Sequence, residues 1–243
     1  MPPADPAPAA RAWTALWSLL LDAAVALLLG GLLLDRYAPP QDLPWKPLRI
    51  GDPIGRATFG KIQAAGADPA LCRRVLREGG VRFADLPERT SGEFCAVRDA
   101  VSITGGTTQL SPAGPAMTCR VALAFAVWDR QVLQPAAREE LGRRATAIEH
   151  YGTYACRRQY GAATGRVSEH ATANAFDVAG VRLAGGRLVT VASDYRDEGE
   201  EGAFMRRLRR GGCAVYRVVL GPDYNAPHGD HFHFDQGAFR ICR

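Results

Sequence analysis

Lysine is nearly absent from this 243-residue chain, in which Lys46 and Lys61 are the only two lysines among 30 basic residues. The net charge of +5 is therefore carried almost entirely by arginine, which binds carboxylates and phosphates through paired hydrogen bonds. Such a balance suits an acidic partner, for example a polymer that carries carboxylates, or simply a solvated surface. The sequence also lacks a basic stripe with interleaved aromatic residues, so a nucleic-acid-binding protein is not indicated.

The sequence lacks any Cys-x-x-Cys pair as well, which argues against a structural zinc knuckle. Its 6 cysteines are widely spaced and follow a hydrophobic N-terminal segment. This pattern is typical of three disulfides made in an oxidising compartment.

No cleavage site of the Ala-x-Ala kind follows that hydrophobic segment. Residues 1–12 are rich in Pro and Ala and are expected to form a disordered tail. Residues 13–34 are almost continuously apolar, long enough to span a bilayer core of roughly 30 Å. Asp22 would cost about 3 kcal/mol in that core, which leucines at about −0.5 kcal/mol each offset. We therefore predict a single uncleaved transmembrane anchor rather than a signal peptide.

Residues 35–49 hold four prolines and are expected to be a semi-rigid linker. Residues 50–243 are expected to form the folded domain, which the cysteines place on the oxidising side of the membrane. The prediction is a single-pass inner-membrane protein with its C-terminal domain in the periplasm.

Hydrophobic periodicity gives a coarse order of elements within the domain. Helices are expected at 70–77, 116–133, 136–143 and 200–210, with Gln134-Pro135 breaking the chain between the second and third. Strands are expected at 93–103, 146–154, 173–181, 187–192, 214–220 and 231–234. Because helices come first and hairpin strands later, we predict an α+β fold, with N-terminal helices packed on a small antiparallel sheet.

Four of the 5 histidines lie in two short motifs, residues 168–177 and 221–235. The first offers His170 and Asp177, and the second offers the pair His231 and His233. Residues two apart in a strand share a face, so both histidines of the pair are expected to point to one side, together with Asp235. Two imidazoles and a carboxylate, with one position left for water, are the ligands of a catalytic zinc.

These motifs, with Cys119-Arg120 and Gly152 to Arg157, resemble the bacterial extensin-like C-terminal domain family over roughly residues 60–243. They are also similar to the wider superfamily of lysostaphin-type endopeptidases, D-Ala-D-Ala peptidases and hedgehog domains. The resemblance implies a four-stranded antiparallel sheet around Zn²⁺ held by His170, Asp177 and His233. It further implies a peptidase that hydrolyses peptidoglycan stem or cross-link peptides. A zinc-containing wall-binding module with little activity is the alternative, and a purely structural envelope protein is a third.

The resemblance leaves the general base open between Asp230, three residues before the last ligand, and His231. Strand alternation favours His231, because Asp230 reaches the metal only if the strand begins with a bend. The resemblance also gives Arg157 the role of polarising a substrate carbonyl or holding a carboxylate, with Arg158 as the neighbour most easily confused with it. Ser168 would lie beside the site. His228, in a Pro- and Gly-containing loop, is a candidate for the rim, although a plain surface histidine is the simpler interpretation.

Other residues are assigned structural roles. His150 has no motif around it. The arginines of 206–210 are expected to be a solvated helix face. Among the disulfides we predict Cys213–Cys242, whose members flank the second motif, and, from proximity along the chain, Cys72–Cys95 and Cys119–Cys156.

Overall fold

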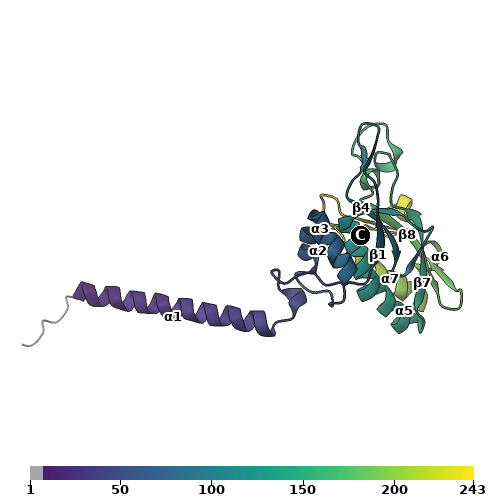
Figure 1. Ribbon diagram of the computed structural model, residues 1–243. Helices are drawn as coiled ribbons and strands as arrows, with labels where there is room; N and C mark the ends of the chain where they lie inside the picture. Colours follow the sequence, from purple (N-terminus) through teal and green to yellow (C-terminus); the bar gives the residue numbers. More distant parts are fainter. Residues whose placement is uncertain (1–7) are drawn as a thin grey trace, which may run out of the picture.

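The structure, a computed structural model, describes residues 8–243 (Figure 1). Its first helix, α1 (Pro8–Tyr37), extends away from the folded domain, and its apolar window from Leu16 to Tyr37 is 0% buried. By length and composition it is the one helix in residues 8–243 that could cross a membrane, as an anchor or as a signal sequence. A disordered tail was expected at residues 1–12. Residues 1–7 lie outside the described residues, and residues 8–12 form the start of α1.

The segment after α1 is docked on the domain rather than extended freely. A short 3-10 helix, η1 (Pro40–Asp42), is followed by buried Leu43, Leu48 and Ile50. Leu48 and Ile50 belong to the same core cluster as buried residues of α2 (Thr58–Ala67) and α3 (Pro69–Glu78). Asp68 caps α3, because its carboxylate accepts hydrogen bonds from the backbone N–H groups of Ala70 and Leu71.

Helix α4 (Cys119–Trp128) forms the centre of the core, and all its residues except Arg120 are buried. The helix begins three residues later than expected, because Ala116–Thr118 form strand β6 and Thr118 caps the helix through its hydroxyl. The predicted break at Gln134-Pro135 is wrong. The chain continues through a π-helical turn, Asp129–Leu133, into α5 (Gln134–Leu141), so the helical path passes Pro135 although proline has no backbone N–H to donate.

The main sheet has seven strands in the order β12-β10-β11-β8-β7-β5, with β9 paired to β8. Its strands are β5 (Gln109–Ser111), β7 (Ala145–Gly152), β8 (Ala175–Leu183), β9 (Leu188–Thr190), β10 (Val218–Leu220), β11 (Phe232–Asp235) and β12 (Ile241–Cys242). The α+β class is therefore confirmed, but the small antiparallel sheet is not. The sheet is larger and mixed, because β5 pairs with β7, and β12 with β10, in parallel.

Two smaller sheets complete the described strands. The first has the order β1-β4-β6, and the second is a hairpin of β2 and β3. Their bounds are β1 (Arg82–Asp85), β2 (Arg89–Ser91), β3 (Cys95–Val97) and β4 (Ala100–Gly105).

Aromatic packing on one face of the main sheet decides which residues lie on the other. Phe176 of β8 contacts Phe125 of α4 with ring centroids 5.6 Å apart, and Phe234 of β11 contacts Trp128 at 5.5 Å. Since side chains alternate along a strand, Asp177 and His233 must lie on the opposite face. The core thus orients the polar residues of both motifs outward.

Helix α7 (Glu200–Gly212), together with the single turn α6 (Val191–Asp194), packs beside α5 and the sheet. The Trp128 indole N–H donates to the Leu208 carbonyl at 3.0 Å. The arginines expected to form a solvated face are exposed at Arg210 and partly exposed at Arg206, Arg207 and Arg209. Arg207 pairs with Glu139 and Glu140 of α5, and the side chains of Arg206 and Arg209 also bind neighbouring groups.

Three disulfides cross-link the domain, and all 6 cysteines are paired. The predicted Cys213–Cys242 bond is confirmed. The other two predicted pairs are wrong, because Cys72 bonds Cys119 and Cys95 bonds Cys156. The first of these ties α3 to the start of α4, and the second ties β3 to the loop after β7.

The Cys213–Cys242 bond holds the edge strand β12 to the end of α7. We expect the Cys213→Ser/Cys242→Ser variant to lose about 3–4 kcal/mol of unfolding free energy, because the bond closes a loop across 29 positions. Urea unfolding followed by circular dichroism measures this loss. A midpoint unchanged from the wild type would contradict it.

Candidate metal centre

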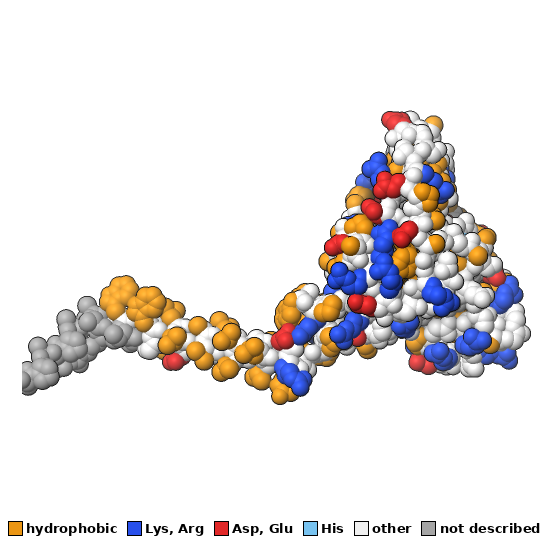
Figure 2. Space-filling model, in the orientation of Figure 1, with side chains coloured by type: hydrophobic (Ala, Val, Ile, Leu, Met, Phe, Trp, Pro, Cys, Tyr) orange, Lys and Arg blue, Asp and Glu red, His pale blue; other side chains and the backbone are white. Residues whose placement is uncertain are grey.

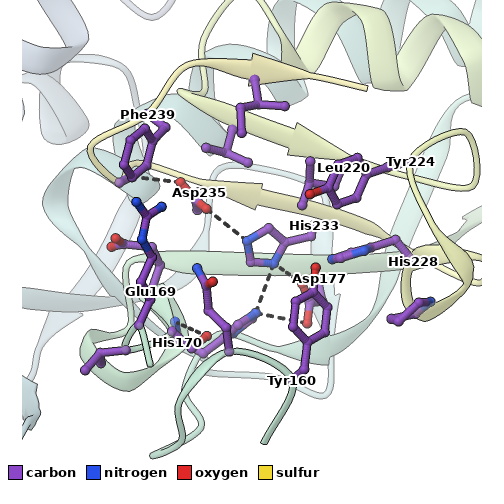
Figure 3. A pocket seen from close by; sticks show the side chains of 18 of the residues that line it. Tyr160, Glu169, His170, Asp177, Leu220, Tyr224, His228, His233, Asp235 and Phe239 are labelled. Carbon is purple, nitrogen blue, oxygen red and sulfur yellow. Dashed lines mark hydrogen bonds and ion pairs between the residues drawn. The ribbon is translucent and has the colours of Figure 1, made fainter. Parts of the chain in front are cut away.

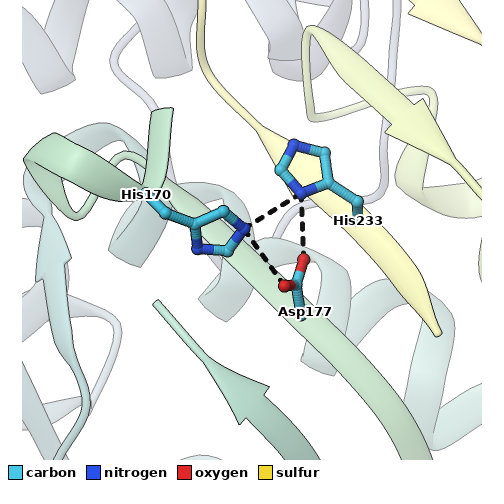
Figure 4. Close-up of side chains that lie close together, drawn as sticks. All are labelled: His170, Asp177 and His233. Atoms are coloured by element: carbon cyan, nitrogen blue, oxygen red, sulfur yellow. Dashed lines mark hydrogen bonds and ion pairs between the residues drawn. The ribbon is translucent and has the colours of Figure 1, made fainter. Parts of the chain in front are cut away.

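Three side chains of the two motifs meet on the outer face of the main sheet (Figure 4). His170 Nε2 lies 3.1 Å from Asp177 Oδ2 and 3.1 Å from His233 Nδ1. His233 Nδ1 lies 2.9 Å from Asp177 Oδ1. The three groups offer ligand atoms that all lie within 4.8 Å of one another, so one ion can contact all three.

Strand register and a cap bring these ligands together. Asp177 of β8 and His233 of β11 are direct cross-strand partners in an antiparallel pair. His170 lies on the 3-10 helix η4 (Glu169–Thr172), immediately before β8. Ser168 caps that helix, because its hydroxyl accepts the His170 backbone N–H at 3.3 Å. This cap helps fix the backbone at His170.

Hydrogen bonding dominates the electrostatics of the cluster. Burial alone would raise the pKa of Asp177, but hydrogen bonds from His170 and His233 hold it well below its usual range. Burial alone would lower the pKa of His233, but its bonds to Asp177 and Asp235 raise that pKa to about 9. The cluster thus keeps its carboxylate ionised, the state that a metal ligand needs, whereas His233 carries a proton that a metal ion would displace on binding.

Asp235 supports the site from behind. Its Oδ2 lies 3.0 Å from His233 Nε2, and its Oδ1 accepts the Gly237 backbone N–H at 2.8 Å. The Nε2–H of His233 is thereby held toward Asp235, which leaves Nδ1 facing His170 and Asp177. A metal-binding histidine in proteins usually has such a partner on its other nitrogen.

His231 and Asp230 form a second pair beside the three ligands. His231 Nε2 lies 3.7 Å from Asp177 Oδ1, and His231 Nδ1 lies 2.8 Å from Asp230 Oδ1. The Asp230 side chain is 54% exposed, whereas that of His231 is only 13% exposed. These contacts form a chain of polar side chains that leads from the three ligands to His231 and then to Asp230. It ends at the Tyr151 hydroxyl, which donates to Asp230 Oδ2 at 3.3 Å.

The cluster opens into a cleft of about 770 Å³ (Figure 3). Arg157, Ser168, His228 and His231 line it, but Asp230 does not. Arg157 is exposed on one wall. Its neighbour Arg158 is engaged elsewhere, because its guanidinium donates to the Gly165 carbonyl and lies over the Phe94 ring.

The interpretation of His228 as a plain surface histidine is wrong. The residue is only 9% exposed, and its Nδ1 lies 2.5 Å from Asn225 Oδ1. Its ring lies 5.3 Å from the His231 ring and 5.8 Å from that of His233, centroid to centroid. Burial and the neighbouring imidazoles lower its pKa to about 4, so it is neutral at physiological pH.

His150, assigned a structural role, lies away from the three ligands. It is buried, packs against Phe176, and its Nε2 lies 2.8 Å from the Pro112 carbonyl oxygen. It does not line the cleft.

Sequence reasoning missed several residues that complete the site. Tyr151 comes from β7, and Tyr160 and Tyr224 come from loops that meet only in the folded chain. Alternation along β11 placed Asp235 on the right face without assigning it a role. Glu169 accepts a hydrogen bond from Asn174 at 2.7 Å, which closes the turn between η4 and β8.

Comparison with family models matches residues 70–243 to the extensin-like protein C-terminus. The chain belongs to this family. The match covers both histidine motifs and all three disulfides of the extensin-like domain. No curated protein and no solved structure matches the chain.

The side chains of the extensin-like domain fit a zinc ion by the chemistry of their donors. Zinc prefers imidazole nitrogen and carboxylate oxygen, and a catalytic site has three such ligands and an open position. His170, Asp177 and His233 all line the cleft, so an ion held by them would be accessible to water and substrate. Asp235 supplies the outer-shell partner that such ligands need.

We expect Asp235→Asn to weaken zinc binding about 10–100-fold while leaving the three ligands in place, because an outer-shell carboxylate orients the ligating imidazole. Competition with a chromophoric chelator measures the affinity. Asp230→Asn is the matched control, since Asp230 touches no ligand, and it is expected to bind zinc as the wild type does. Equal affinity in all three proteins would contradict the role of Asp235.

Proposed function

We propose that the extensin-like domain is a zinc-dependent peptidase that hydrolyses amide bonds in peptidoglycan stem or cross-link peptides in the periplasm. On this proposal α1 is a single-pass inner-membrane anchor. The observation that carries the proposal is the His170–Asp177–His233 cluster at the base of an open cleft, with the His231–Asp230 pair beside it. The resemblance of both motifs to those of D-Ala-D-Ala peptidases supports the substrate class.

Zinc held by these three side chains would polarise an amide carbonyl and acidify a water molecule. His231 lines the cleft with its Nε2 3.7 Å from Asp177 Oδ1, and on this proposal it would take the proton of that water. The Asp230 carboxylate accepts the Nδ1–H of His231, fixes its tautomer and stabilises the imidazolium. The same imidazolium then returns the proton to the leaving amine.

Arg157 is proposed to hold a carboxylate of the substrate at the cleft wall. We expect Arg157→Gln to raise KM about tenfold at unchanged zinc content, since a charge-assisted hydrogen bond is worth about 1.5–3 kcal/mol and this one is exposed. Arg158→Gln is the matched control, because Arg158 is engaged by Gly165 and Phe94. An equal rise in KM for both variants would contradict the assignment.

The decisive experiment incubates the purified, zinc-loaded full chain with intact sacculi and maps the released muropeptides by mass spectrometry. We expect new peptide termini that a chelator suppresses and added zinc restores. If the loaded protein cleaves nothing but sediments with sacculi, the wall-binding module replaces the peptidase. If it neither cleaves nor binds sacculi, a structural role remains.

A further inference from the structure

A buried lysine lies far from the histidine cluster, on the side of the domain that α1 joins. Lys61 of α2 is 7% exposed, and its Nζ donates one hydrogen bond, to the Pro40 carbonyl at 2.5 Å. No carboxylate in residues 8–243 forms an ion pair with it; burial lowers its pKa, and Asp52 and Asp42 oppose this only from a distance. An ammonium group has three donors, and a buried charge without a partner is costly. An anion bound next to Lys61 would therefore stabilise its charged form.

Lys61 lines a cavity of about 680 Å³ between α2, α3 and the segment that follows α1. The other basic side chains of this cavity are Lys46 and Arg56, and its only acid is Asp42. The rest of the lining is mostly apolar: Pro44, Pro47, Leu48, Ala57, Ala64, Ala65, Leu71 and Val75. A cavity lined by both basic and apolar side chains suits a molecule with a phosphate at one end and hydrocarbon at the other.

Several residues that line the cavity, among them Asp42 and Lys46, follow the end of α1 closely along the chain. Trp45 is 60% exposed and donates its indole N–H to Asp35 at 2.7 Å, and Lys46 pairs with the same carboxylate. Figure 2 shows Lys and Arg side chains, with Asp and Glu side chains among them, where α1 meets the domain. Exposed Tyr37 and Trp45 at this end of the apolar helix, and Trp13 and Trp17 at the other, are placed as membrane-interface aromatic residues are.

We propose that this cavity binds the phosphate headgroup of an anionic phospholipid of the membrane that α1 crosses. Lys61, Lys46 and Arg56 contact the phosphate, and the adjoining part of the acyl chains lies on Leu48, Leu71 and Val75. The bound lipid holds the domain against the bilayer, which fixes the height of the cleft above the membrane. This inference rests on the anchor of the proposed function, and it is independent of the peptidase chemistry.

The test compares lipid binding to the full chain in detergent micelles by native mass spectrometry. The probes are phosphatidylglycerol and phosphatidylcholine of equal chain length. We expect at least a tenfold preference for phosphatidylglycerol in the wild type. Lys61→Met should abolish that preference, whereas Arg74→Met should retain it, because Arg74 is exposed on α3 outside the cavity.

Equal binding of the two lipids by the wild type would overturn the proposal, and this comparison holds even if Lys61→Met fails to fold. Displacement of phosphatidylglycerol by equimolar inorganic phosphate would also overturn it, because the ligand would then be a free anion. Release of the chain from membranes by alkaline carbonate would remove the anchor and this inference together. Zinc content and sacculus cleavage, measured on the same proteins, show separately whether the peptidase proposal stands.

Discussion

His233→Ala is expected to purify with almost no zinc, whereas the wild type is expected to hold one zinc per chain. The substitution removes one of three converging ligands and leaves Asp177 without the partner that lies 2.9 Å from it. Two remaining ligands do not complete the usual set of a catalytic zinc site. Metal analysis of protein dialysed against a weak chelator measures the content.

His231→Ala is the matched control for that experiment, because His231 lies in the same cleft but outside the ligand set. It should retain one zinc. Equal zinc in His233→Ala and the wild type would remove His233 from the site. Loss of zinc from His231→Ala as well would show that the ligand set is wider than the three side chains.

Turnover of cross-linked muropeptides by His231→Ala is expected to fall about 10²–10⁴-fold at unchanged zinc content, the usual contribution of a general base. Asp230→Ala should cost much less, because Asp230 reaches the cleft only through His231 and its side chain is 54% exposed. Single-turnover rates with defined muropeptides separate this chemical step from binding.

The reverse order, with Asp230→Ala the more damaging change, would make Asp230 the base. It would require the Asp230 side chain to turn into the cleft, away from its bonds to His231 and Tyr151. Equal losses in both variants would indicate that the pair acts as a unit.

The residues brought together at the candidate site were largely predictable because each lies in a local pattern. Strand alternation placed His233, His231 and Asp235 on one side, and the first motif supplied His170 and Asp177. His228 was misjudged because it lies in the loop around the short 3-10 helix Ala226–His228, where no periodicity predicts burial. Tyr151 was missed because β7 meets the second motif only through the three-dimensional fold.

Two of the three disulfide pairings could not be predicted from the spacing of the cysteines. Proximity along the chain favoured Cys72–Cys95 over Cys72–Cys119, yet the entropic cost of closing a loop grows only with the logarithm of its length. Going from a span of 23 positions to one of 47 costs less than about 1 kcal/mol by that relation. Packing of α3 on α4 easily exceeds this difference, and packing is not visible in spacing. The parallel pairings of β5 and β12 are non-local in the same sense.

The direct pairing of Asp177 with His233 has a consequence for how the sheet avoids misassembly. A slip of one residue in either strand would turn the polar side chain of that strand, Asp177 or His233, into the space held by Phe125 and Trp128, and would turn its phenylalanine out to water. The correct alignment is thus enforced twice, by aromatic rings that must be inside and by ionisable groups that must not be. Selection for the reactive face and selection against mispaired strands therefore act on the same few positions.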